Sequence, residues 1–142
     1  MLKSNLIMFQ DKINRIIAGL DDAIEIARAN AIQSIYAESL FRIFNEGKDK
    51  NENQIGGYSN SYKKVRTKKG YQIGYVDLTF TGTLKNSINR DNKKVFFKNN
   101  YGVKISGYNE KNFGKRIFAP SKTEAEVWTK ELDFELKKLW KS

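Results

Sequence analysis

This chain of 142 residues has no cysteine, no histidine and a single proline. Without cysteine it can form no disulfide, no thiolate zinc site and no thiol nucleophile. Without histidine it lacks the commonest general base and metal ligand. No stretch approaches the roughly 18 apolar residues of a membrane span, and charged residues interrupt the apolar ones at the N-terminus. Most familiar hydrolase sites are therefore excluded, and we expect neither a signal peptide nor a membrane partner.

The remaining composition is that of a folded protein of one domain. Hydrophobic residues make up 39% of the chain and charged residues 30%, which is enough apolar surface to form a core. The carboxylates of the middle segment are too scattered for a metal-dependent nuclease; they are Asp49, Glu52, Asp77, Asp91 and Glu110. We therefore expect no enzyme, no cofactor and no bound metal.

The positive charge is concentrated in the middle of the chain. Residues 1–46 carry 5 basic and 6 acidic side chains, residues 47–118 carry 16 and 5, and residues 119–142 carry 5 and 5. The net charge of +10 therefore arises from the middle segment. A localised excess of this kind suits an acidic partner better than an evenly basic composition does.

The N-terminal segment, residues 1–46, reads as one long helix or two nearly continuous ones. Apolar residues recur every three or four positions and form one stripe: Leu6, Ile13, Ile16, Ile17, Leu20, Ile24, Ala27, Ala31, Ile35 and Leu40. Gly19 is the weakest point of this helix, and Gly47 is its expected stop. An unbroken helix would be on the order of 60 Å long, longer than a compact domain can cover. Either the helix bends back near Gly19, or, as we prefer, it packs in an oligomer.

Residues 47–75 read as a polar, basic loop or arm, with a brief strand pair around Val65 and Ile73. Within it, "KKVRTKK" places five cations beside three tyrosines. Cations mixed with aromatic rings suit phosphate contact and base stacking, although charge runs are commonly solvated surface. The candidate contacts with DNA or an acidic partner are Lys63, Lys64, Arg66, Lys68 and Lys69.

Residues 76–118 read as a β-rich segment. In "KVFFKNNYGVKISG", a turn at Asn99 and Asn100 would pair residues 95–98 with residues 101–105 as a hairpin. The run "YVDLTF", residues 75–80, offers a third strand. The pattern thus predicts a small antiparallel sheet.

Residues 119–142 read as a C-terminal helix. Ser121 is a natural N-cap, and Glu124 stands three places on, at the spacing of a capping box. Apolar residues follow at helical spacing: Ala125, Trp128, Leu132, Leu136 and Leu139. Together the segments predict an α+β fold of a long N-terminal helix, a small antiparallel sheet with a long polar loop, and a C-terminal helix.

The stretch "FTGTLKNSI", residues 80–88, reads as a strand end, a tight reversal at Gly82 and a short helical turn. Leu84 and Ile88, four residues apart, would share its buried side, and Thr81 or Thr83 would cap it. The hydroxyls of this stretch have no histidine to activate them. The stretch therefore indicates a structural role.

"TGTLKNSI" resembles the Thr-Gly-x-Leu-x-x-Ser-Ile signature of tailed-phage virion-morphogenesis proteins, the tail-completion or neck proteins between the portal and the tail tube. The matching residues are Thr81, Gly82, Leu84, Ser87 and Ile88. A second similarity is the basic residue, aromatic residue and proline before the C-terminal helix, which here are Arg116, Phe118 and Pro120.

The resemblance implies a structural virion protein that forms part of the head–tail connector ring by oligomerisation. Its expected partners are copies of itself, the adjacent portal or connector and tail proteins, and packaged DNA through non-specific phosphate contacts. Its expected location is the head–tail junction of the virion, and the host cytoplasm during assembly. The alternative is a nucleic-acid-binding domain without sequence specificity that uses the basic loop rich in tyrosine and lysine.

Overall fold

The computed structural model describes residues 2–142 and confirms the α+β class. A long helix opens the chain, a second long helix closes it, and short elements lie between them. In chain order the elements are α1 (Leu2–Phe44), α2 (Asn60–Lys68), α3 (Thr83–Asn86), β1 (Ile88–Arg90), β2 (Val95–Phe97), α4 (Asn100–Phe113) and α5 (Lys122–Lys141).

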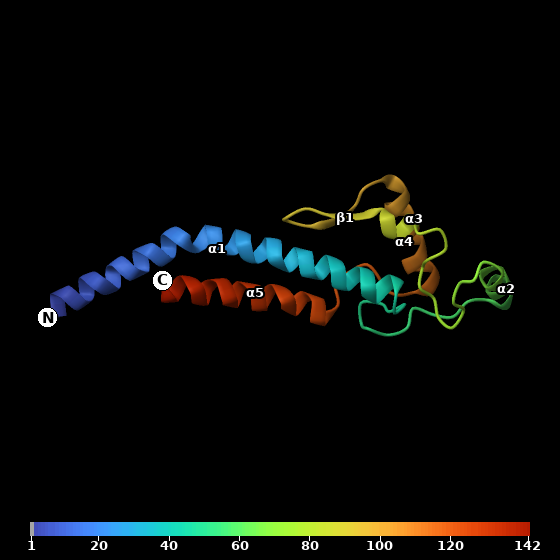
Figure 1. Cartoon of the computed structure of the whole chain (residues 1–142), viewed down its shortest axis with the longest axis horizontal. Helices are drawn as coiled ribbons and strands as arrows, with labels where there is room; N and C mark the ends of the chain where they lie inside the picture. Colours follow the sequence, from blue (N-terminus) through green and yellow to red (C-terminus); the bar gives the residue numbers. More distant parts are fainter. Residues whose placement is uncertain (1) are drawn as a thin grey trace.

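The molecule is elongated, with a two-helix stalk and a head at one end (Figure 1). Helices α1 and α5 run antiparallel along the stalk, and the short elements gather around the C-terminal end of α1. At 1.5 Å per residue, α1 is about 65 Å long and α5 about 30 Å. Helix α5 therefore covers only part of α1, and the first turns of α1 project beyond it.

Small residues on α1 form the seam with α5. Gly19, Ala23, Ala27 and Ala31 follow one another at intervals of four and so lie on one side of the helix. The three alanines are almost fully buried. Side chains this small let the two helix backbones approach closely along the stalk.

Helix α1 runs through Gly19 without a break, so the alternative in which the chain folds back there is wrong. It ends at Phe44, and Gly47 follows with a φ of +64°. A side chain at Gly47 would also collide with the carbonyl oxygen of Val76. Both the positive φ and the lack of space therefore require glycine at this position. The predicted stop near Gly47 is confirmed.

An ion pair joins the end of α1 to the start of α5. Arg42 donates from Nε to both carboxylate oxygens of Glu124, at 3.1 and 3.0 Å, and its other nitrogens donate to the carbonyl oxygens of Lys48, Ile117 and Ala119. Glu124 also completes the predicted capping box, because it accepts from Ser121 N–H while the Ser121 hydroxyl accepts from Glu124 N–H. One buried carboxylate thus both starts α5 and holds it to α1.

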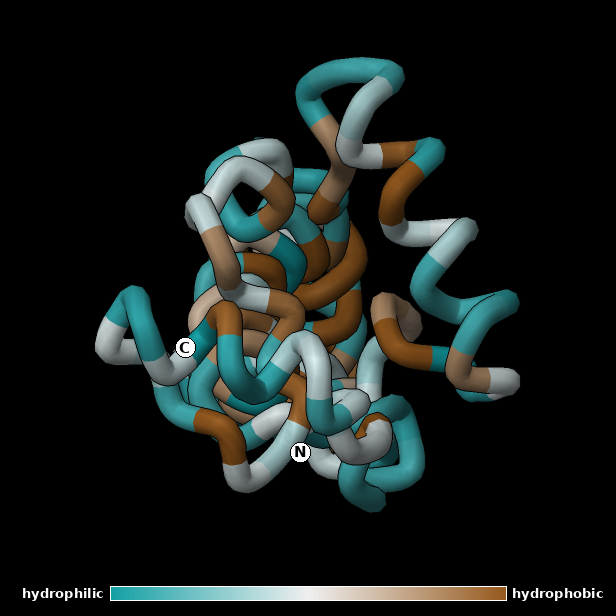
Figure 2. Tube along the Cα trace, turned by 90° about the vertical axis from the view of Figure 1, so that its right-hand side faces the viewer, coloured by the Kyte–Doolittle hydropathy of each residue, from teal (hydrophilic) through white to brown (hydrophobic). Residues whose placement is uncertain are grey.

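The hydrophobic core lies in the head, where the end of α1 meets the middle segment. Its buried members come from α1, the connecting loops, α3 and β1; they are Ile43, Phe44, Ile55, Val76, Leu84, Ile88 and Ile117. Viewed from the head end, apolar residues gather toward the centre and hydrophilic residues occupy the outer loops (Figure 2). The head is therefore held by side chains that are distant in sequence.

The predicted loop of residues 47–75 contains a helix. Ser59 caps α2 by accepting a hydrogen bond from Tyr62 N–H at 3.3 Å, and Gly70 follows the helix with a φ of +74°. Val65 lies within α2, and Ile73 lies in irregular chain. The predicted strand pair around these two residues is therefore wrong.

The predicted hairpin is displaced along the chain. Asn99 does not form a turn but caps α4, where its side-chain oxygen accepts from Gly102 N–H at 2.9 Å, so residues 101–105 are helical. The observed hairpin pairs β1 with β2 in antiparallel register, with Ile88 opposite Phe97 and Arg90 opposite Val95. The expectation that residues 95–98 pair with residues 101–105 is wrong, because the same asparagine chemistry serves turns and helix caps alike.

The third predicted strand, residues 75–80, is also wrong. The Asp77 carboxylate accepts from Thr79 N–H at 3.0 Å, and Leu78 takes a φ of +52°. A left-handed residue in the middle of the run cannot continue a β-ladder. The small sheet among residues 2–142 consists of two strands.

Candidate functional site

The stretch with the family-like motif forms a tight reversal followed by one helical turn. Gly82 has a φ of +80°, and α3 begins directly after it. Leu84 and Ile88 are both buried, as predicted. The Thr81 hydroxyl accepts from Thr83 N–H at 3.4 Å, while Gly82 itself occupies the N-cap position without a side-chain cap. The motif thus turns the chain and anchors the turn in the core.

Ser87 fixes how α4 packs against this turn. Its buried hydroxyl donates to the carbonyl oxygen of Leu84 at 2.6 Å. A Cβ added to Gly102 of α4 would lie 2.5 Å from the Ser87 hydroxyl and 2.8 Å from the Phe97 ring. A small side chain at position 87 and none at 102 therefore let α4 seat directly on the motif.

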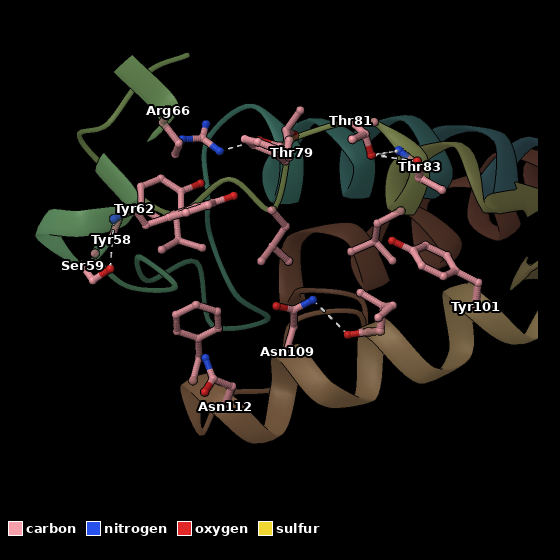
Figure 3. A pocket seen from close by; sticks show the side chains of 18 residues that line it. Tyr58, Ser59, Tyr62, Arg66, Thr79, Thr81, Thr83, Tyr101, Asn109 and Asn112 are labelled. Atoms are coloured by element: carbon pink, nitrogen blue, oxygen red, sulfur yellow. Dashed lines mark hydrogen bonds between the residues drawn. The ribbon is translucent and has the colours of Figure 1, made fainter. Parts of the chain in front are cut away.

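A groove of about 480 Å³ opens between α2, the motif and α4. Its walls carry tyrosine rings, threonine hydroxyls and asparagine amides; Figure 3 labels Tyr58, Tyr62, Thr79, Thr81, Thr83, Tyr101, Asn109 and Asn112 among them. Arg66 is the only charged side chain of the lining, and carboxylates are absent from it. Such a lining suits binding through hydrogen bonds and ring contacts, and offers no acid–base pair.

Arg66 lines this groove from α2 and lies beside Thr79 (Figure 3). It is 2% exposed and donates to the carbonyl oxygens of Gln72 and Thr79, at 2.8 and 2.5 Å, and to the Asp77 carboxylate at 3.2 Å. Its guanidinium carbon also lies 4.4 Å from the centroid of the Tyr58 ring. The charge and the hydrogen-bond donors of Arg66 are therefore paired with groups of the protein itself.

Tyr58 completes the same network. Its hydroxyl donates to Asp77 Oδ1 at 2.8 Å and accepts from Asp77 N–H at 3.1 Å. Burial, together with the adjacent Asp77 carboxylate, raises the pKa of Tyr58 well above its ordinary value. The neutral phenol is the form that the fold requires.

The candidate cations on α2 and at its C-cap, Lys69, separate into two groups. Lys64, Lys68 and Lys69 are exposed and Lys63 is half-buried, so these four remain open to an acidic partner. Arg66 is not available to a phosphate, because it is buried against Asp77. Of the five candidate contacts with DNA or an acidic partner, the burial of Arg66 therefore argues against this residue alone.

The second family-like group lies where the head meets α5. Phe118 packs edge-on against Phe97, with ring centroids 5.6 Å apart, and its N–H donates to Glu110 at 3.0 Å. Pro120 directly precedes the N-cap of α5, and Arg116 is exposed. These residues connect the core to the second stalk helix.

The first turns of α1 expose an unusual amount of apolar surface. Leu6 is 65% exposed and Phe9 58%, and Leu2, Ile7, Met8 and Ile17 are exposed to a similar or greater extent. Leu2, Leu6, Phe9 and Ile13 recur at helical spacing and form one stripe. These four residues are hereafter the N-terminal stripe, and residues 2–11, which include the first three of them, extend beyond the end of α5 (Figure 1).

Sequence reasoning missed the groove and the burial of Arg66, because both depend on α2 and α4. Two local signals indicate these helices: Ser59 precedes α2, and Gly114 ends α4 with a φ of +63°. Within residues 2–142 there is neither a helix long and apolar enough to cross a membrane nor an acidic cluster arranged to hold a metal ion. No family model, curated protein or solved structure matches the chain.

Proposed function

We propose that this chain is a non-enzymatic structural protein of a tailed-phage virion, which joins copies of itself and adjacent parts into the connector ring at the head–tail junction. The observation that carries the proposal is the N-terminal stripe. Exposed apolar side chains that recur along one side of a projecting helix mark a protein interface. A structural role also fits the motif residues, which hold the head together.

The stripe supports assembly because its own chain does not cover it. Lys12 Nζ lies 4.7 Å from the centroid of the Trp140 ring, so α5 ends close to Lys12 and residues 2–11 extend past it. Burying such side chains stabilises a complex by roughly 25 cal/mol per Å² of apolar area removed from water. A neighbouring subunit is the simplest cover in a ring.

The basic face of α2 favours a second role in the same setting. Lys64 and Lys68 are exposed, stand four residues apart and therefore lie on one side of the helix. Their placement suits contact with phosphates without recognition of the bases. In a virion the phosphates would be those of packaged DNA; if the chain acts alone, it would be a nucleic-acid-binding domain. Binding through such contacts weakens steeply as salt rises.

Light scattering of the purified chain tests assembly through the stripe. A double variant, Leu6→Glu with Phe9→Glu, places two charges on the stripe and is expected to reduce the population of large assemblies. Met8→Glu is the matched control, because Met8 is 69% exposed but stands on roughly the opposite side of the helix from Leu6. Equal assembly by the double variant and the wild type would contradict the role of the stripe.

Immunogold labelling tests the proposed location. Antibodies against this chain should label particles of the encoding phage at the head–tail junction, and label elsewhere on the particle or none would contradict the proposal.

The nucleic-acid role is tested separately by DNA binding of Lys64→Glu with Lys68→Glu at low salt. The control is Lys130→Glu with Lys141→Glu on α5, where both lysines are exposed.

A further inference from the structure

An apolar groove of about 290 Å³ runs between α1 and the β1–β2 hairpin. It is distinct from the groove of Figure 3. From α1 it is lined by Ile32, Tyr36 and Ile43 among others, and from the hairpin side by Val95, Phe96 and Phe97. Its lining is almost entirely hydrophobic, which suits the side of a helix or another apolar surface.

Cations of the hairpin flank this apolar groove. Arg90 lies opposite Val95 in the ladder, and its guanidinium carbon stands 5.8 Å from the centroid of the Tyr36 ring. Lys94 Nζ stands 5.7 Å from the centroid of the Phe96 ring, and Lys93 beside it is exposed. A partner that fits both the groove and its rim is therefore apolar and acidic.

Helix α1 itself carries such a surface. Asp21, Asp22 and Glu25 are exposed on it, and Ile17, 65% exposed, stands one turn before Asp21. The only charged partner that Glu25 has among the described residues is Arg28, in an exposed pair at 3.2 Å, which contributes little to stability. We call this set, Ile17, Asp21, Asp22 and Glu25, the acidic face.

The groove and the acidic face lie on the same side of α1. Asp21, Glu25, Ile32, Tyr36, Ser39 and Ile43 follow at intervals of 4, 7, 4, 3 and 4 residues, which keep to one side of a helix. Their centres are about 16 residues apart, or about 24 Å along a rigid helix. The acidic face therefore cannot enter the groove of its own chain.

We infer that the acidic face of a second copy occupies this groove. Because both surfaces share one side of α1, an antiparallel second copy places its acidic face on the first copy's groove and receives the first copy's acidic face in its own. Such a reciprocal contact is two-fold symmetric and closes as a dimer. The pairing goes beyond the proposed ring and does not involve the N-terminal stripe.

Charge reversal tests this pairing in the full-length chain. One variant reverses the acidic face (Asp21→Lys with Glu25→Lys) and another reverses the hairpin (Arg90→Glu with Lys94→Glu). Light scattering of the wild type should show a species with the mass of two copies beside the larger assemblies formed through the N-terminal stripe, and each reversal should weaken dimerisation at least about tenfold. An equimolar mixture of the two variants should dimerise again, because both contacts of the mixed pair are then complementary.

Matched reversals at other exposed sites, Glu126→Lys on α5 and Lys104→Glu on α4, should leave the dimer intact. If circular dichroism shows that the hairpin variant is unfolded, Lys93→Glu with Lys94→Glu in the exposed turn replaces it. A monomeric wild type, a dimer indifferent to both reversals, or a mixture that stays monomeric would overturn the pairing. If the stripe variant loses the large assemblies but keeps the dimer, both proposals are supported. If the dimer responds to charge reversal but the stripe variant assembles like the wild type, only the proposed ring assembly is contradicted.

Discussion

Leu139 of α5 lies against Gly19 of α1, so closely that a Cβ added to Gly19 would stand 2.7 Å from Leu139 Cδ1. The contact lies near the end of α5 and marks where the two-helix seam begins. Glycine inside a helix normally weakens it, by up to about 1 kcal/mol relative to alanine. Here the missing side chain lets Leu139 occupy the space.

Replacing Gly19 with alanine therefore combines two opposing effects. Alanine favours the helix, but its Cβ must displace the end of the flexible Leu139 side chain. We expect Gly19→Ala to change the free energy of unfolding by less than about 0.5 kcal/mol. Gly107→Ala in α4, where a Cβ meets nothing within 4 Å, should stabilise by about 0.5–1 kcal/mol. Thermal unfolding measures both, and equal gains would show that Leu139 does not seat on Gly19.

Gly102→Ala should be clearly destabilising. The new Cβ would lie 2.5 Å from the Ser87 hydroxyl and 2.8 Å from the Phe97 ring, in a packed part of the head. Overpacking of this kind costs about 1–3 kcal/mol. Urea unfolding measures the loss, again with Gly107→Ala on the same helix as the control. A neutral Gly102→Ala would contradict the close seating of α4 on the motif.

Arg66→Lys should destabilise the head although it preserves the charge. Lysine cannot reproduce the planar set of donors that reaches Gln72, Thr79 and Asp77 at once. Removing one partner of a buried pair costs about 3–5 kcal/mol, and we expect this substitution to approach that range. Lys64→Ala, an exposed neighbour on α2, should stay within about 0.5 kcal/mol. Urea unfolding compares the two, and similar small losses would contradict the role given to Arg66.

Stability should fall in acid through Glu124. Burial alone would raise the pKa of this carboxyl, but hydrogen bonds from the Ser39 hydroxyl and Ser121 N–H, together with Arg42, hold it below the ordinary value. A carboxyl with a lowered pKa contributes stability above the unfolded-state pKa of about 4.3, and that contribution is lost as the pH falls toward the folded-state pKa.

Glu124→Gln should consequently unfold more easily at pH 7, and the gap between it and the wild type should narrow below about pH 4. Urea unfolding at a series of pH values checks this. Glu126→Gln, two residues further along α5 and exposed, serves as the control. A gap that is constant with pH would show that the Glu124 charge does not stabilise the fold.

Several expectations from the sequence succeeded because their signals are local. Ser121 and Glu124 form the predicted capping box within a single turn of helix, and Gly82 makes the predicted reversal with a positive φ. Gly47 stops α1 for the same conformational reason. Such features need only a few neighbouring residues, so the residue types alone indicate them.

Other expectations failed where one residue type serves two structures. Asn99 has the chemistry of a turn and of a helix cap, and it caps α4 because Gly102 lets that helix seat against Ser87. The partner of β2 is β1, which the motif brings beside it. Neither choice is visible in the residues around Asn99.

By itself, the sequence determined that a long helical segment opens the chain and a shorter helix closes it, because both signals are periodic and local; that α1 continues unbroken through Gly19 was decided only by the structure. Only the tertiary structure decided the fate of the charges, because burial depends on partners distant along the chain. Arg66 stands in a basic run but is enclosed by Asp77 and Tyr58, whereas Lys64 and Lys68, on the outer side of the same helix, stay free of the core. Helical spacing places Arg66 and the two lysines on different sides of α2. Long-range packing then buries one side and leaves the other exposed to solvent.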